Sequence, residues 1–102
     1  MYLDYLKQKI GQEGKKVCIF PMGIAGKSML TKLRSVGIEI DFFCDNNSRL
    51  WGTSYCGKKC ISKNELIEQA ESTLVIIESL YYKEIKESLL VDGVCNIERV
   101  FF

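Results

Sequence analysis

The alternation of strand-like and helix-like segments constrains the fold of this chain more than any other feature. Apolar runs of strand length occur at 17–20, 38–45, 73–77 and 97–102. Between them, at 27–36, 62–70 and 81–91, apolar residues recur every three to four positions, as in an amphipathic helix. Strands that alternate with helices form a parallel sheet, because each right-handed crossover lays its helix on a face of that sheet. The sequence therefore predicts a three-layer α/β fold with helices on both faces.

The predicted sheet has about four main strands. We expect them in the order 38–45, 17–20, 73–77 and 97–102, as in half of a doubly wound fold. Cys60-Ile61 is a candidate for one more, very short strand, and 46–59 is expected to be a polar loop or a weak hairpin. We interpret residues 1–102 as a single domain, in which 1–14 supply an amphipathic helix and 15–102 supply the βαβ core.

The composition excludes several classes of function. There is no histidine, so a Ser-His-Asp triad, a Cys-His pair and a His₃ zinc site are all impossible within this sequence. The formal net charge of +1 lacks the basic excess of a duplex nucleic-acid binder. No apolar run approaches the roughly 18 residues of a membrane span. We therefore predict neither a nucleic-acid partner nor a membrane-spanning segment.

Five cysteines bear on compartment and metal binding. Their number is odd, and the first ten residues mix charged with apolar side chains, unlike a signal peptide. Free thiols in a reducing cytoplasm are expected. Cys56 and Cys60 are separated by three residues, whereas zinc knuckles and redox pairs usually have two. No metal site is predicted.

The turn at 21–28, after the first strand, is the main candidate for a binding site. Gly23 and Gly26 match the second and third glycines of the dinucleotide fingerprint G-x-G-x-x-G, while Pro21 stands in place of the first. The fingerprint also expects an acidic residue about 20 positions further on, and Asp45 lies there, at the end of the second predicted strand. The candidate cofactor-binding residues are Gly23, Ile24, Ala25, Gly26, Lys27, Asp45 and Asn46.

Two other interpretations of this turn were weighed, of which we reject the first and keep the second open. Gly26-Lys27-Ser28 matches the end of a P-loop, but P-loop domains are normally longer than this chain. In a purely structural interpretation, the glycines only let a helix approach the sheet, and Asp45 only caps the turn that follows it.

The motifs taken together resemble a bacterial Rossmann-like domain. The resemblance is carried by residues 17–27 (VCIFPMGIAGK), 37–47 (GIEIDFFCDNN) and 57–66 (GKKCISKNEL). Such domains occur in nucleotide-sugar dehydratases and epimerases, and at the N-termini of acetyltransferases or attached to glycosyltransferases of surface-polysaccharide synthesis. The resemblance implies NAD(P) or a nucleotide-sugar as ligand, with Gly23 and Gly26 facing phosphates and Asp45 as the acid after the second strand.

Three hypotheses of function follow. The first is a nucleotide- or dinucleotide-binding module, accessory to glycan biosynthesis and without complete catalytic machinery, whose partner is a nucleotide-type ligand or a glycan-biosynthesis enzyme. The second is an interaction domain that has lost its ligand, and a homodimer is an open alternative for either. The third is a small enzyme that uses Asp45 or Glu78 as a general base. We assign no catalytic residue, and the isolated chain fits a binding module better than an enzyme.

Overall fold

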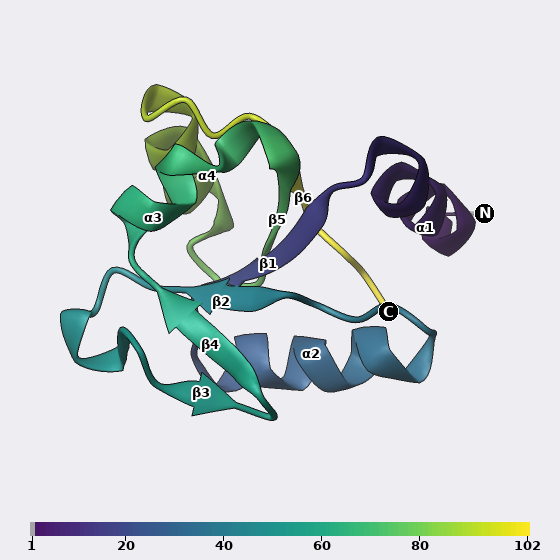
Figure 1. Cartoon of the computed structure of the whole chain (residues 1–102), viewed down its shortest axis with the longest axis horizontal. Helices are drawn as coiled ribbons and strands as arrows, with labels where there is room; N and C mark the ends of the chain where they lie inside the picture. The colour runs from purple at the N-terminus through teal and green to yellow at the C-terminus, as the bar shows by residue number, and fades with distance from the viewer. Residues whose placement is uncertain (1) are drawn as a thin grey trace.

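Within residues 2–102, which the computed structural model describes, six strands form one sheet in the order β3-β4-β2-β1-β5-β6 (Figure 1). All neighbouring strands are parallel except β3 and β4, which form an antiparallel hairpin. The strands are β1 (Lys16–Phe20), β2 (Phe42–Cys44), β3 (Ser54–Tyr55), β4 (Lys58–Ile61), β5 (Thr73–Ile77) and β6 (Ile97–Glu98). The helices are α1 (Tyr2–Glu13), α2 (Ile24–Ser35), α3 (Lys63–Glu68) and α4 (Tyr82–Val91), with 3₁₀ turns at Ser48–Leu50 and Ala70–Ser72.

The α/β architecture is confirmed, but the sheet is larger than expected. The four predicted main strands keep their relative order, and the sheet continues beyond β2 with β4 and then β3. Cys60 and Ile61 lie in β4, which pairs in parallel with β2, and the segment 46–59 contains β3 together with the start of β4. The prediction of about four strands was therefore too low.

Several predicted boundaries were also wrong. The run at 38–45 forms a strand only over Phe42–Cys44, although Ile38 and Ile40 are buried in the core. Asp41, the last residue before β2, is held to β1 by two hydrogen bonds. Its N–H donates to Val17 O, and its Oδ2 accepts from Val17 N–H. The last strand likewise stops at Glu98. A buried apolar run thus need not be hydrogen-bonded as a strand along its whole length.

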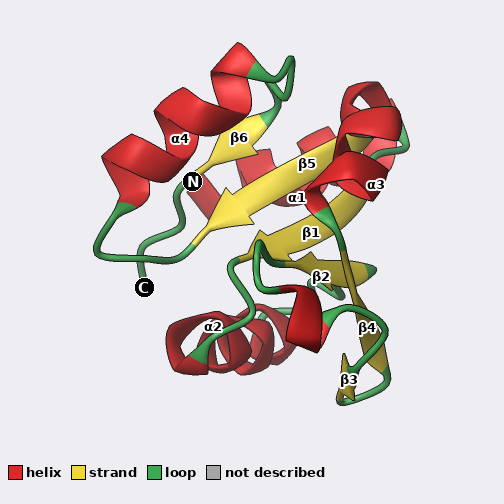
Figure 2. Ribbon diagram, turned by 90° about the vertical axis from the view of Figure 1, so that its left-hand side faces the viewer, coloured by secondary structure: helices red, strands yellow, loops and turns green. Residues whose placement is uncertain are grey.

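Each face of the sheet carries its own apolar cluster, because side chains of a strand alternate between faces. Val17 and Ile19 belong to the cluster with α1 and α2, whereas Cys18 and Phe20 belong to the cluster with α3 and α4. Figure 2 shows α2 on one side of the sheet and α3 and α4 on the other. This is the three-layer arrangement that the alternating sequence pattern predicts.

Two local features set the ends of helices near the site. The N-terminus of α3 is capped as the sequence pattern indicates, since Ser62 Oγ accepts from Glu65 N–H at 3.2 Å. Helix α2 begins at Ile24, three residues before the predicted start, so its first turn contains most of the glycine motif.

Among the described helices, none combines the length and apolar character needed to cross a membrane.

Candidate functional site

The predicted site lies where the chain changes direction across the sheet. From β1 the chain passes through α2 to β2 on one side, and α3 later carries it back to β5 on the other side of β1. In open α/β sheets, ligands bind outside the carboxyl ends of the strands at such a switch point. Phe20 and Ile77 are paired at the carboxyl ends of β1 and β5, so the turn that follows Phe20 begins at this point.

Gly26 allows α2 to approach β1 closely. It is buried in the first turn of the helix, and an added Cβ would lie 2.2 Å from Pro21 O and 3.2 Å from the Cγ2 atom of Ile19. A distance of 2.2 Å to a backbone carbonyl oxygen is far inside van der Waals contact. Gly26 therefore has the packing role that the third glycine of the fingerprint requires.

Gly23, Ile24 and Ala25 form the open mouth of the turn. A Cβ on Gly23 would meet no atom within 4 Å, and the Ile24 side chain is 92% exposed. The first bond of the helix runs from Lys27 N–H to Gly23 O at 2.9 Å, and no side chain caps this helix end. The N–H groups of residues 24–26 precede that bond and have no partner within the helix. This end of α2 is thus open to an anion.

Asp45 connects the end of β2 to the turn after β1. Its Oδ2 atom accepts from Met22 N–H, and its Oδ1 atom accepts from Asn47 N–H, both at 2.9 Å. The second bond is the Asx-type cap of the structural interpretation. An ionised carboxylate has about four acceptor positions, so about two remain for hydroxyl donors of a ligand. The indole N–H of Trp51 donates to the Asp45 carbonyl at 2.7 Å and holds the following loop near the site.

Lys27 reaches toward the hairpin. Its ammonium lies 5.1 Å from the centre of the Tyr55 ring, in β3, within the range of a cation–π contact. The structure therefore places Lys27 at the α2–β3 contact, and the open N–H groups belong to residues 24–26.

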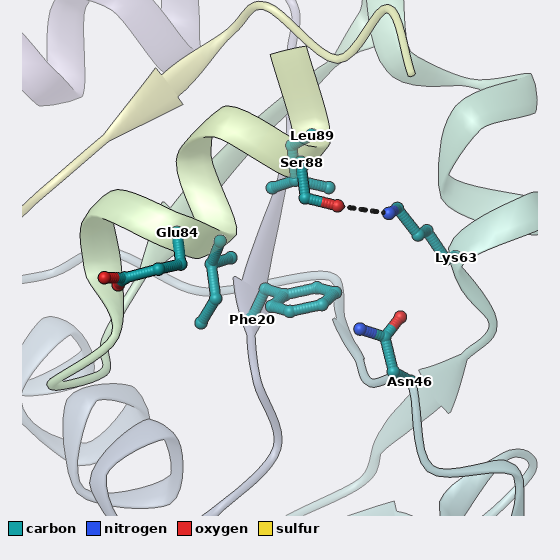
Figure 3. Close-up of a pocket in the computed structure, with 7 residues that line it drawn as sticks. Phe20, Asn46, Lys63, Glu84, Ser88 and Leu89 are labelled. Atoms are coloured by element: carbon teal, nitrogen blue, oxygen red, sulfur yellow. Dashed lines mark hydrogen bonds between the residues drawn. The ribbon is translucent and has the colours of Figure 1, made fainter. Parts of the chain in front are cut away.

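A cavity of about 230 Å³ lies on the other face of the sheet, at the carboxyl end of β1 (Figure 3). Its polar side is organised by Lys63, whose ammonium donates to Ser88 Oγ at 2.8 Å and pairs with Asp92 Oδ2 at 2.5 Å. Sequence reasoning identified only Asn46 of the lining residues. Lys63 is the residue after the predicted cap Ser62, which was the available signal for it. The cavity is lined by Phe20, Asn46, Lys63, Glu84, Ile85, Ser88 and Leu89.

Asp45 and Glu78 follow strands that are not adjacent. Glu78 is half-buried after β5, and its N–H donates to Phe20 O at 3.0 Å. β1 lies between β2 and β5, so the strands that carry the two carboxylates are about 10 Å apart. No described contact joins them, and the geometry gives neither one a defined catalytic role.

The cysteines of the sheet are shielded thiols. Cys18, Cys44 and Cys60 are buried in β1, β2 and β4, while Cys56 is exposed in the hairpin turn. Burial raises the pKa of Cys44 to about 12 and that of Cys60 to about 11. Among residues 2–102, no three His, Cys, Asp or Glu side chains are grouped as metal ligands would be.

Strand order, parallel pairing and the glycine turn together define a Rossmann-like α/β domain. A family model described as C2185-like, N-terminal matches residues 13–99, and the chain belongs to this family. No protein with a curated description matches its sequence.

Two solved structures have a similar fold. One is UDP-D-quinovosamine 4-dehydrogenase from Vibrio fischeri, with a TM-score of 0.60 and 23% identity, where the match covers 83% of this chain and 75% of that chain. The other is RSP, a Rex-family repressor, with a TM-score of 0.60 and 16% identity, covering 98% of this chain and 60% of that chain. At these identities the likeness shows the fold.

Proposed function

We propose that this chain is a nucleotide-binding Rossmann-like module, with NAD(P) or a nucleotide-sugar as its ligand and without complete catalytic machinery of its own. One observation carries the proposal. The uncapped N-terminus of α2 and the cavity beside Phe20 lie on opposite faces of the sheet, and both begin at the carboxyl end of β1. A nucleotide has an anionic part and a flat base, and this edge of the sheet offers a place for each.

The residues fit such a ligand part by part. The N–H groups of residues 24–26 would bind phosphate oxygens, and the open space above Gly23 lets those oxygens approach the backbone. The remaining acceptor positions of Asp45 would bind sugar hydroxyls, as expected for the acid after the second strand. The ring of Phe20 would contact the base. Each of these groups binds or orients the ligand, and none performs a chemical step.

The glycan context is the finer part of the proposal. The sequence motifs resemble domains of polysaccharide biosynthesis, and one structure with a similar fold is named as a UDP-sugar dehydrogenase. We infer that the partner of this module is an enzyme of glycan biosynthesis in the cytoplasm.

An interaction domain without a ligand is the second candidate. It is favoured by the exposed apolar side chains at the same edge, because Ile24 is 92% exposed and Leu80 is 98% exposed. Asp45 already has structural bonds that would explain its presence without a ligand. Under this hypothesis another protein surface would cover the edge.

Calorimetric titration with NADH, NADPH, UDP-glucose and coenzyme A tests the first candidate. Saturable binding of at least one nucleotide is expected, and Gly23→Ala should weaken it at least tenfold, because the new methyl group would stand where phosphate oxygens approach. Gly11→Ala is the matched control, since a Cβ there also meets nothing within 4 Å but lies in α1. Absence of heat with all four compounds, together with an unchanged melting temperature, would contradict the proposal and leave the interaction domain.

A further inference from the structure

We propose that the loop after β2, from Asp45 to Trp51, holds a pyranose ring, so that the ligand of this module is a nucleotide-sugar. The inference rests on the proposed nucleotide binding and goes beyond it by choosing between the two classes of ligand. It is carried by an exposed tryptophan ring that is fixed beside Asp45, whose carboxylate binds the turn after β1.

Hydrogen bonds within the loop bring its polar groups together. Asn47 N–H donates to Asp45 Oδ1 at 2.9 Å, and the indole N–H of Trp51 donates to the Asp45 carbonyl oxygen at 2.7 Å. The Oδ1 atom of Asn47 accepts from Arg49 N–H at 3.1 Å, so the NH₂ group of this exposed side chain is the part that can donate to a ligand. A carboxylate, an amide and an indole ring therefore lie on one short loop.

The loop lies on the α2 side of the sheet, next to the turn after β1. Leu50 packs against the apolar cluster that contains residues of α1 and α2, and Figure 2 shows the 3₁₀ turn that ends at Leu50 on the same side of the sheet as α2. Asp45 Oδ2 accepts from Met22 N–H, two residues before the open N–H groups of residues 24–26. In a nucleotide-sugar the pyranose is bonded directly to the diphosphate. A diphosphate held by those N–H groups would thus bring the pyranose to this loop.

Trp51 offers an apolar ring surface to a ligand. It is 43% exposed, although tryptophan is highly buried on average. Its indole N–H is the one polar group of the side chain, and the bond to the Asp45 carbonyl satisfies that group and fixes the ring. The exposed part of the ring is therefore left for apolar contacts.

This combination distinguishes a pyranose from the other rings of the candidate ligands. A pyranose has a flat face of C–H groups, which packs on an aromatic ring, and hydroxyl groups around its rim, which donate to a carboxylate. Nicotinamide is flat but has no hydroxyl group for Asp45. Ribose has hydroxyl groups but is too small and too puckered to cover an indole. Asp45 and Trp51 together thus favour a nucleotide-sugar over NAD(P).

UDP and its sugar conjugates give the sharpest test, because they share the nucleotide. In calorimetric titration of the whole chain, Trp51→Ala should weaken the binding of UDP-glucose or UDP-N-acetylglucosamine about tenfold, because the ring positions the pyranose for a hydrogen bond to a charged acceptor. The binding of UDP should stay unchanged. Trp51→Phe keeps an aromatic ring and should retain most of the affinity. Phe102→Ala removes another exposed ring, at the end of the sequence, and should change neither affinity.

The fluorescence of Trp51 reports the contact directly, since it is the only tryptophan in the sequence. A pyranose stacked on the ring excludes water from it. The emission of the wild-type protein should therefore shift to shorter wavelength on addition of a UDP-sugar, but not on addition of UDP. Unshifted emission at saturating UDP-sugar would overturn the stacking, and this measurement needs no variant to fold.

Each result has a separate meaning. If Trp51→Ala binds the UDP-sugars as tightly as the wild-type protein does, the pyranose site is overturned and nucleotide binding is left intact. An equal loss of affinity for UDP and UDP-sugar in Trp51→Ala also overturns the site, because the ring would then act on the nucleotide or on the fold. Binding of NADH without binding of either UDP-sugar overturns the choice of ligand class. If none of these compounds binds, the proposed function fails as well.

Discussion

Substitution of Gly26 by alanine tests whether α2 is as close to β1 as the structure shows. The added Cβ would lie 2.2 Å from Pro21 O, whereas real Cβ atoms essentially never come within 3.0 Å of such a neighbour. The helix or the turn must therefore move by at least 0.8 Å, which is the difference between the two distances. The carbonyl belongs to the backbone of the turn, so no flexible side chain can give way.

The expected loss of stability follows from what α2 contributes to the core. Met29, Leu30 and Leu33 lie on its buried face, and a shift of the helix displaces all of them from their packing. Overpacking of a close-packed core costs about 1–3 kcal/mol, and we expect about 2 kcal/mol here. For a domain of this size that corresponds to a melting temperature lower by about 8–16 °C.

Urea denaturation followed by far-ultraviolet circular dichroism measures the effect. Gly11→Ala is the control, because a Cβ at that position meets nothing within 4 Å. Gly11→Ala should be neutral or stabilising by up to about 1 kcal/mol, since alanine favours helix. If the free energy of unfolding of Gly26→Ala is within about 0.5 kcal/mol of the wild-type value, the packing role is refuted. Close approach of phosphate would then be the reason for this glycine.

Three further changes have defined outcomes. Asp45→Ala should lower the free energy of unfolding by about 2 kcal/mol in urea titrations, because two backbone N–H groups lose a charged acceptor, and an unchanged midpoint would contradict this. Burial raises the pKa of Cys44 to about 12, so the folded state keeps a proton that the unfolded chain loses above pH ~9. The contribution of Cys44 to stability should be level below that pH and fall by up to about 1.4 kcal/mol per pH unit as the pH rises toward 12. The free energy of unfolding of the wild-type protein should therefore fall more steeply with pH than that of Cys44→Ala, and equal slopes would show that this thiol is not buried. Ser62→Ala should cost about 1 kcal/mol through loss of the α3 cap, with Ser72→Ala on the exposed 3₁₀ turn as a comparison that should change less.

The centre of the fold was predictable because its strands are buried on both faces. Residues 17–20 and 73–77 are continuous apolar runs, and both form parallel strands in the structure. The sheet edge beyond β2 was harder to predict. β4 begins with Lys58 and Lys59, which have the polarity of a loop, and only Cys60 and Ile61 face the core. Its pairing with β2 depends on tertiary context that no short segment displays.

The turn after β1 was predictable because it depends on consecutive residues. Gly23 and Gly26 lie within four positions, and the turn they form is local. The cavity was not predictable, because it combines residues from β1, the loop after β2, α3 and α4. Lys63 and Ser88 are 25 positions apart and meet only because α3 and α4 cover the same face of the sheet.

Two interpretations of Asp45 are compatible with each other. Sequence reasoning set a ligand-binding acid against a cap for the following turn, and the structure shows the cap, through Asn47 N–H. The bond from Met22 N–H adds a function that neither interpretation contained, since it fixes the turn after β1 to the end of β2. A carboxylate held by two backbone donors is oriented before any ligand arrives, which lowers the entropy lost when its remaining acceptor positions bind hydroxyl groups. The structural role of Asp45 is therefore a reason to expect sugar binding there, and Asp45→Asn, which keeps an acceptor oxygen for one of the two bonds, should separate the effects by weakening ligand binding more than folding.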